Sequence, residues 1–214
     1  MGLMTTCWLG AYTLIIVEGF RTGKVHIPSS CTFINITWEF YLGFYSPPPE
    51  KHIQLFAAFW CTLNILILYQ VIEYNKSSFP TWMGGGGSID LGSTILYVAS
   101  ICGILYLCLE VHKIFGTILG DPYLRYDGIF IQMYMSLTFV QEIEKSPIVS
   151  RTELYIGVLR GIGSFFAGFG NYPGPPMYTK YDVIPHTILI TILDLIYVVK
   201  AWRKYRISGR LYAA

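Results

Sequence analysis

Two carboxyl side chains, Glu39 and Asp194, lie in apolar stretches near opposite ends of the sequence. Glu39 falls within residues 31–45, and Asp194 falls within residues 191–197. An acidic side chain at mid-membrane costs roughly 2.5–3.5 kcal/mol on insertion scales, so it usually faces a protein interior and has a function there. The two acids predict an acid/base pair built in the middle of a helix bundle.

Other polar groups share the helix face of Glu39. Asn35 lies four residues before it, which places both side chains on one face, and Trp38 lies beside them. An amide, an indole and a carboxyl group are therefore expected together. The structural alternative is an ordinary helix–helix hydrogen bond with an interfacial tryptophan, and the cost of a buried acid favours function over it.

The second acid has a structural alternative of equal weight on spacing alone. Arg160 also lies in an apolar stretch, where its charge requires a carboxylate partner. Asp194, Glu142 and Glu110 are the candidates. A salt bridge is the favoured role for Arg160, and the sequence leaves open which acid forms it.

Aromatic side chains are frequent in the same stretches, and Trp38 and Tyr41 lie next to Glu39. Each ring alone is more often packing than function. Together they would suit a carbocation, because ring faces attract positive charge. The sequence contains no DDxxD, NDxxDxxxD, HExxH or GxSxG pattern and no closely spaced His/Cys set, so we expect neither a metal site nor a cofactor.

The composition predicts an all-α, multi-pass integral membrane protein. Of 214 residues, 53% are hydrophobic and 13% are charged, against about 25% charged in soluble domains. The basic residues form no stripe, so nucleic acid is not an expected partner. A spanning helix needs about 20 apolar residues. Residues 1–214 are therefore expected to form one domain of seven transmembrane helices, at 3–20, 31–45, 52–72, 91–115, 128–143, 154–172 and 183–202.

Lys and Arg residues are more frequent in the loops on one side of this bundle and in the tail after residue 202. The positive-inside bias predicts an outside or lumenal N-terminus and a cytosolic C-terminus.

Four short motifs resemble those of the small integral-membrane terpene cyclases, seven-span enzymes of fungal meroterpenoid and indole-diterpene pathways with bacterial relatives. The motifs are Asn35-x-x-Trp38-Glu39, Trp60-x-x-x-Asn64, Arg160-Gly-Ile-Gly-Ser164 and Asp194 in the last span. The resemblance covers nearly the whole chain and implies that Glu39 and Asp194 are the essential acids. One departure is Asn64, where that family commonly has Asp.

The resemblance implies a metal-independent cyclase. Such an enzyme protonates a terminal epoxide or alkene of a prenyl chain, and a cation cascade closes rings without ionising a diphosphate. The expected partners are an isoprenoid or prenylated substrate, the lipid bilayer, and an upstream prenyltransferase and epoxidase. The location would be the endoplasmic reticulum in a fungus or the plasma membrane in a bacterium. The expected substrate-binding residues are Asn35, Trp38, Tyr41, Asn64, Arg160 and Glu142.

Two other classes of function use the same residues. A seven-span transporter would use the buried acids as a proton relay, although the chain has no convincing internal repeat. A receptor or scaffold would use them for stability alone. The substrate, the ring pattern and the identity of the proton donor stay open at this point.

Overall fold

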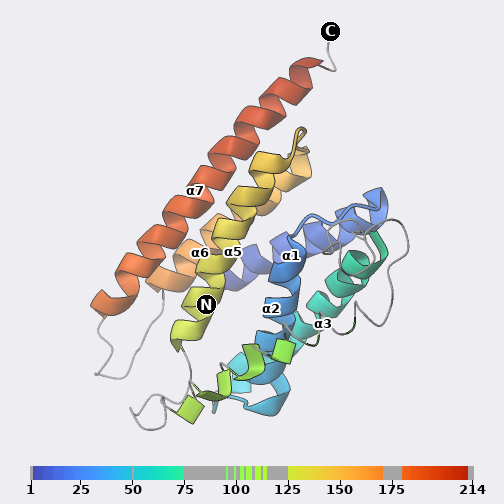
Figure 1. Cartoon of the computed structure of the whole chain (residues 1–214). Helices are drawn as coiled ribbons and strands as arrows, with labels where there is room; N and C mark the ends of the chain where they lie inside the picture. Colours follow the sequence, from blue (N-terminus) through green and yellow to red (C-terminus); the bar gives the residue numbers. More distant parts are fainter. Residues whose placement is uncertain are drawn as a thin grey trace. The chain divides into compact units, whose positions relative to one another are not determined.

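The computed structural model describes residues 2–49, 51–74, 125–170 and 180–211, together with isolated helical residues between 95 and 114. Throughout these ranges the regular structure is helical, with no strand, which confirms the all-α prediction (Figure 1). The expected span at 91–115 lies largely outside the described residues. The chain divides into two compact units, one of residues 1–18 and 129–214 and the other of residues 19–128.

The first unit contains the start of α1 (Gly2–Thr22), most of α5 (Arg125–Lys145), α6 (Arg151–Gly170) and α7 (Lys180–Leu211). Helices α5, α6 and α7 follow one another in alternating directions (Figure 1). Helix α6 packs against α7, and Gly157 is one reason for the close approach. A Cβ atom at Gly157 would overlap the ring of Tyr197 on α7, so a larger residue would push the helices apart.

A capping box begins helix α6. The backbone N–H of Ser150 donates to Glu153 Oε2 at 2.7 Å, and the N–H of Glu153 donates to Ser150 Oγ at 3.1 Å. Two amide groups that the first turn cannot satisfy are paired in this way. Tyr197 of α7 then donates its hydroxyl to the Glu153 carbonyl oxygen at 3.2 Å, which joins the start of α6 to α7.

The second unit contains α2 (Ser29–Phe40), a π-helical turn η1 (Tyr41–Tyr45) and α3 (Lys51–Tyr74). Pro28 precedes α2 with extended backbone angles, and three prolines at 47–49 follow η1. Proline lacks an N–H group and excludes a helical conformation for the residue before it, which ends the helix there. Both α2 and η1 pack against α3.

The π-helical turn directly follows Glu39 and Phe40. The N–H of Ser46 donates to the Tyr41 carbonyl oxygen at 2.8 Å, the i→i+5 pairing of a π-helix. Gly43 allows this turn to meet α3, because a Cβ atom there would lie 2.8 Å from the backbone nitrogen of Ala58. Gln54 also donates its side-chain amide to the Gly43 carbonyl oxygen at 3.1 Å.

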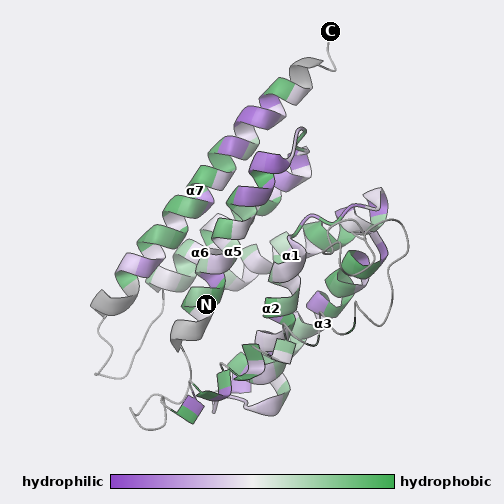
Figure 2. Ribbon diagram, viewed as in Figure 1, coloured by the Kyte–Doolittle hydropathy of each residue, from purple (hydrophilic) through white to green (hydrophobic). Residues whose placement is uncertain are grey.

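The helix surfaces have the polarity expected in a membrane. Among the described residues, three helices are long and apolar enough to cross one: Gly2–Thr22, Lys51–Tyr74 and Ile184–Ser208. Figure 2 shows apolar residues along the middle of α7 and hydrophilic residues toward its C-terminal end. Large apolar side chains such as Leu55 and Leu195 are exposed, whereas Glu39, Asn64 and Arg160 are buried. The seven-span bundle and its orientation stay predictions.

Candidate functional site

Glu39 lies at the end of α2 and is 7% exposed. Its carboxyl oxygen Oε2 accepts a hydrogen bond of 2.6 Å from the Asn64 side-chain amide of α3. Asn64 is fully buried. Cys61, one turn earlier on α3, contacts the carbonyl oxygen of Ile36, so α2 and α3 are in contact along this face. Asn64 thus offers the acid a neutral hydrogen-bond donor.

The orientation of the Asn64 amide follows from its second partner. Nδ2 lies 3.3 Å from the carbonyl oxygen of Trp60, one turn earlier on α3. A flipped amide would put Oδ1 against that carbonyl, and two acceptors would face each other. The Trp60 carbonyl thus directs an N–H group, not an oxygen, at Glu39.

The other predicted residues of this unit lie around the end of α2. Asn35 is buried one turn before Glu39, and Trp38 is half-buried and packs against the Tyr41–Leu109 cluster. The Tyr41 hydroxyl donates to Glu110 Oε1 at 3.0 Å. Glu110, one of the predicted candidates to pair with Arg160, is thus the acceptor for Tyr41.

Aromatic rings gather on the same side of Tyr41. Its ring centroid lies 5.6 Å from that of Tyr45 and 6.2 Å from that of Tyr106, and the Tyr45 and Tyr106 rings meet edge to face at 5.3 Å. An aromatic cluster therefore lies in this unit beside the Glu110 carboxyl group.

Arg160 and Asp194 form a buried ion pair in the other unit, each only 2% exposed. The contact joins Arg160 Nη2 on α6 to Asp194 Oδ1 on α7. The expectation that Arg160 pairs with a carboxylate is confirmed, and Asp194 is the partner. Glu142 instead pairs with Lys145 at 2.9 Å on α5, where both side chains are half or more exposed; as a partner for Arg160 it was the wrong candidate.

The position of Arg160 prevents its charge from reaching water. It lies at the middle of the 20-residue helix α6, about 14 Å along the axis from either end at the rise of an α-helix. One face of its guanidinium covers the ring of Phe139, 4.1 Å from the centroid. Arg160 Nη2 also lies 3.4 Å from Ser136 Oγ.

Most hydrogen-bonding capacity of this ion pair is unused by the described residues. Arg160 Nε and Nη1 and Asp194 Oδ2 are buried, and none of them has a partner among the described residues. Each buried polar atom left unpaired costs about 1–3 kcal/mol, and more when it is charged. Native proteins contain few such atoms, and each calls for a structural or functional reason.

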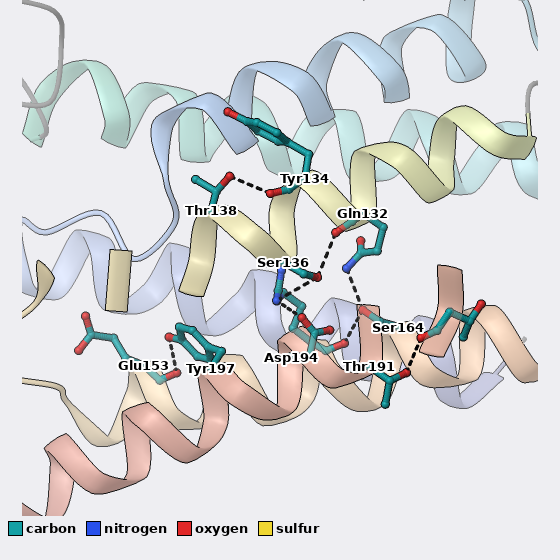
Figure 3. Close-up of polar contacts among 11 residues, drawn as sticks. Gln132, Tyr134, Ser136, Thr138, Glu153, Ser164, Thr191, Asp194 and Tyr197 are labelled. Carbon is teal, nitrogen blue, oxygen red and sulfur yellow. Dashed lines mark hydrogen bonds and ion pairs between the residues drawn. The ribbon is translucent and has the colours of Figure 1, made fainter. Parts of the chain in front are cut away.

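Hydrogen bonds of neutral side chains extend this polar region between α5 and α6 (Figure 3). Gln132 Nε2 donates to Ser164 Oγ at 2.8 Å, and Ser164 Oγ donates to the Arg160 carbonyl oxygen at 2.9 Å. Ser136 Oγ donates to the Gln132 carbonyl oxygen at 3.0 Å. Sequence reasoning did not identify Gln132 and Ser136, although two polar residues four apart in an apolar stretch were a usable signal.

Each unit thus contains, among the described residues, a buried polar group built around one of the two predicted acids. One is a carboxyl group held by an amide at Glu39 and Asn64, and the other is the Arg160–Asp194 ion pair. No group of three or more His, Cys, Asp or Glu side chains suited to a metal ion occurs in the described part of the chain. The chemistry these residues offer is proton transfer and charge stabilisation in an apolar medium.

Comparisons with known proteins place these residues in context. The sequence model of the family described as Pyr4-like transmembrane terpene cyclases matches residues 1–197. The chain is also similar to the Pyr4-family terpene cyclase mfmH of Annulohypoxylon moriforme. The identity is 27% over 207 residues, covering 89% of this chain and 79% of that protein. No solved structure matches the chain.

Proposed function

The chain belongs to the family of Pyr4-like transmembrane terpene cyclases, and on that premise we propose that it closes rings in a prenyl chain by protonating a terminal epoxide or alkene. The protein is an integral membrane enzyme of the kind that serves secondary metabolism. The observation that supports the proposed chemistry best is the buried Glu39 carboxyl group held by the Asn64 amide.

Glu39 is the proposed proton donor. A general acid must carry its proton at neutral pH, and an apolar surrounding favours the neutral form of a carboxyl group over the anion. Asn64 is compatible with that neutral form, because its N–H group donates to a carbonyl-type oxygen and brings no positive charge. A cation in its place would stabilise the carboxylate, so less of the carboxyl group would carry its proton at neutral pH.

The Asn64 contact also selects the oxygen that carries the proton. Since Oε2 accepts the Asn64 N–H, the proton of neutral Glu39 belongs on Oε1. Proton transfer from Oε1 to the epoxide oxygen or the alkene carbon leaves a carboxylate and a carbocation. Neighbouring alkenes attack the cation in turn, and loss of a C–H proton or capture of water ends the cascade.

Asp194 is proposed to act as an anion rather than as the donor. Its partner Arg160 is a guanidinium, which does not lose its proton in proteins, so the pair is zwitterionic. A carboxylate stabilises positive charge that develops on a substrate. Asn35, Trp38 and Tyr41 are the proposed substrate-binding residues, and the aromatic rings would stabilise the cations.

The remaining predictions enter as parts of this proposal. The substrate is an isoprenoid or prenylated compound taken up from the bilayer, supplied by a prenyltransferase and, when epoxidised, by an epoxidase. Location in the endoplasmic reticulum or the plasma membrane depends on whether the source is fungal or bacterial. The family assignment does not favour the transporter alternative.

The test is conversion of epoxidised and plain prenylated substrates by membranes that contain the protein, with mass spectrometry of the isomeric products. General acid catalysis contributes about 10²–10⁴-fold, and a single group that stabilises transition-state charge contributes about 10²–10³-fold. Glu39→Gln and Asp194→Asn are therefore each expected to lose at least about 10²-fold in turnover. Glu144→Gln, at an exposed site paired with Lys200, is the matched control. Normal turnover by a folded Glu39→Gln variant would contradict the mechanism, and transport without chemical change would revive the alternative.

A further inference from the structure

The unused hydrogen-bonding atoms of the Arg160–Asp194 pair are concentrated in one place. A guanidinium carries five N–H donors. Nη2 uses its two on Asp194 Oδ1 and Ser136 Oγ, which leaves the single donor of Nε and the two of Nη1. On the carboxylate of the same pair, Asp194 Oδ2 accepts no hydrogen bond from the described residues. Donors and an acceptor are therefore both available from one buried pair.

The described surroundings supply no other partner for these atoms. Phe139 covers one face of the guanidinium with an apolar ring. Gly161 has no side chain that could donate or accept, and it lies close to Asp194: a Cβ atom at Gly161 would be 3.4 Å from Asp194 Cβ. Ser164 is engaged with Gln132 and with the Arg160 carbonyl oxygen. Arg160 is too far from either end of α6 to direct its donors to water.

Charge and hydrogen-bonding type define what would satisfy these atoms. The pair is already neutral, so an anionic ligand such as a diphosphate would leave net negative charge buried, which is unfavourable. A carbonyl or ether oxygen would accept from Arg160 but leave Asp194 Oδ2 unpaired. A hydroxyl group both accepts from the guanidinium and donates to Oδ2.

We propose that the Arg160–Asp194 pair is a subsite for a neutral hydroxyl group of the substrate, of the alcohol, enol or phenol type. This inference rests on the proposed function only for its choice of ligand, an isoprenoid. The hydroxyl group has two chemical sources: the head of a prenylated compound, or the alcohol that forms at the chain end when an epoxide opens. In either case Arg160 acts as a binding residue and gives selectivity for an oxygenated isoprenoid over a plain one.

The test measures binding of unreactive probes to the protein in nanodiscs. The probes share a saturated chain of farnesyl length, which cannot be protonated and cyclised. The first probe has a phenol head, the second has the methyl ether of that phenol as its head, and the third has an unsubstituted phenyl head. The fourth has a phenyl head and an alcohol at the end of the chain. Hydrogen bonds to charged groups contribute about tenfold or more in affinity. One hydroxyl probe is expected to bind at least about tenfold more tightly than the methyl ether and phenyl probes.

The preferred hydroxyl probe identifies the source of the hydroxyl group. In the variant Arg160→Met/Asp194→Leu, which removes both charges together, the preference is expected to disappear while binding of the phenyl probe persists. Arg203→Met, at an exposed arginine of α7, is the matched control and should keep the preference. Equal binding of all four probes by the wild-type protein would overturn the subsite without any variant, and so would an unchanged preference in the double variant.

The outcome is separable from that of the proposed function. Cyclisation by the wild-type protein with no preference among the probes would refute the hydroxyl subsite alone. A clear preference in a protein that converts no prenylated substrate would refute the cyclase mechanism and leave the subsite in place.

Discussion

The side-chain amide of Asn64 on α3 donates a 2.6 Å hydrogen bond to the carboxyl group of Glu39, a residue of α2 that lies 25 residues earlier in the sequence. The same amide is fixed by the carbonyl oxygen of Trp60, so a donor faces the acid. This relationship distinguishes Glu39 from Asp194. Glu39 has a neutral partner and suits proton donation, whereas Asp194 has a cationic partner in Arg160 and suits stabilisation of positive charge.

The Asn64 contact should be visible in the infrared spectrum of the protein. A protonated carboxyl group has a C=O stretch that a hydrogen bond weakens and moves to lower wavenumber. The band assigned to Glu39 by its loss in Glu39→Gln is therefore expected to move to higher wavenumber in Asn64→Leu. Thr62→Val, on the same helix with its hydroxyl bonded to the Ala58 carbonyl oxygen, should leave the band unmoved. Absence of any protonated carboxyl band for Glu39 would contradict its role as donor.

Removal of one member of the Arg160–Asp194 pair should destabilise the protein more than removal of both. A single buried charge left without its partner costs about 3–5 kcal/mol, whereas apolar replacement of both members is often nearly neutral. Arg160→Met and Asp194→Leu are therefore each expected to lower the unfolding midpoint in detergent, and the double variant is expected to recover most of the loss. Additive losses in the double variant would show that the two side chains are not coupled.

The π-helical turn after α2 depends on Gly43. Its Cβ position lies 2.8 Å from the backbone nitrogen of Ala58, and backbone cannot move aside as a flexible side chain can. Gly43→Ala is expected to cost about 1–3 kcal/mol and to lower turnover, because the displaced turn adjoins Glu39. Gly2→Ala, at a position with no atom within 4 Å of the added methyl group, is the comparison. Unchanged thermal stability and turnover in Gly43→Ala would contradict this packing.

Lys204 completes the C-terminal end of α5. Its ammonium group donates to the carbonyl oxygens of Ile143, Glu144 and Ser146 at 2.7, 2.8 and 2.7 Å. These carbonyls lie at the negative end of the helix and have no partner within it. Lys204→Met is expected to lose about 1–3 kcal/mol of stability, measured as a lower unfolding midpoint. The exposed Arg203, replaced by Met, should show little change; an equal loss there would attribute the effect to net charge instead.

The predicted pairing of Glu39 and Asp194 as one acid/base system can be tested by kinetics. Turnover of Glu39→Gln, Asp194→Asn and the double variant defines a double-mutant cycle. Residues that act as one unit are strongly non-additive. A double variant that loses little more than the worse single variant would support the predicted pairing. Losses that multiply would show that the two acids act independently.

The sequence by itself determined the helical class and singled out charged side chains that the structure buries. Apolar stretches exclude other membrane architectures for this composition, and the cost of burying Glu39, Arg160 or Asp194 made each one stand out without any structure. Spacing of four residues also placed Asn35 with Glu39, because the period of a single helix is a local property.

Tertiary structure alone decided which side chains meet across helices. Arg160 had three candidate carboxylates in the sequence, and the structure pairs it with Asp194. Glu110 instead accepts a hydrogen bond from Tyr41, and Glu142 pairs with Lys145. The same holds for Asn64 and Glu39, and for Gln132 and Ser164. Such contacts depend on the rotation and crossing of each helix, which are set by packing at positions such as Gly43 and Gly157 rather than by local periodicity.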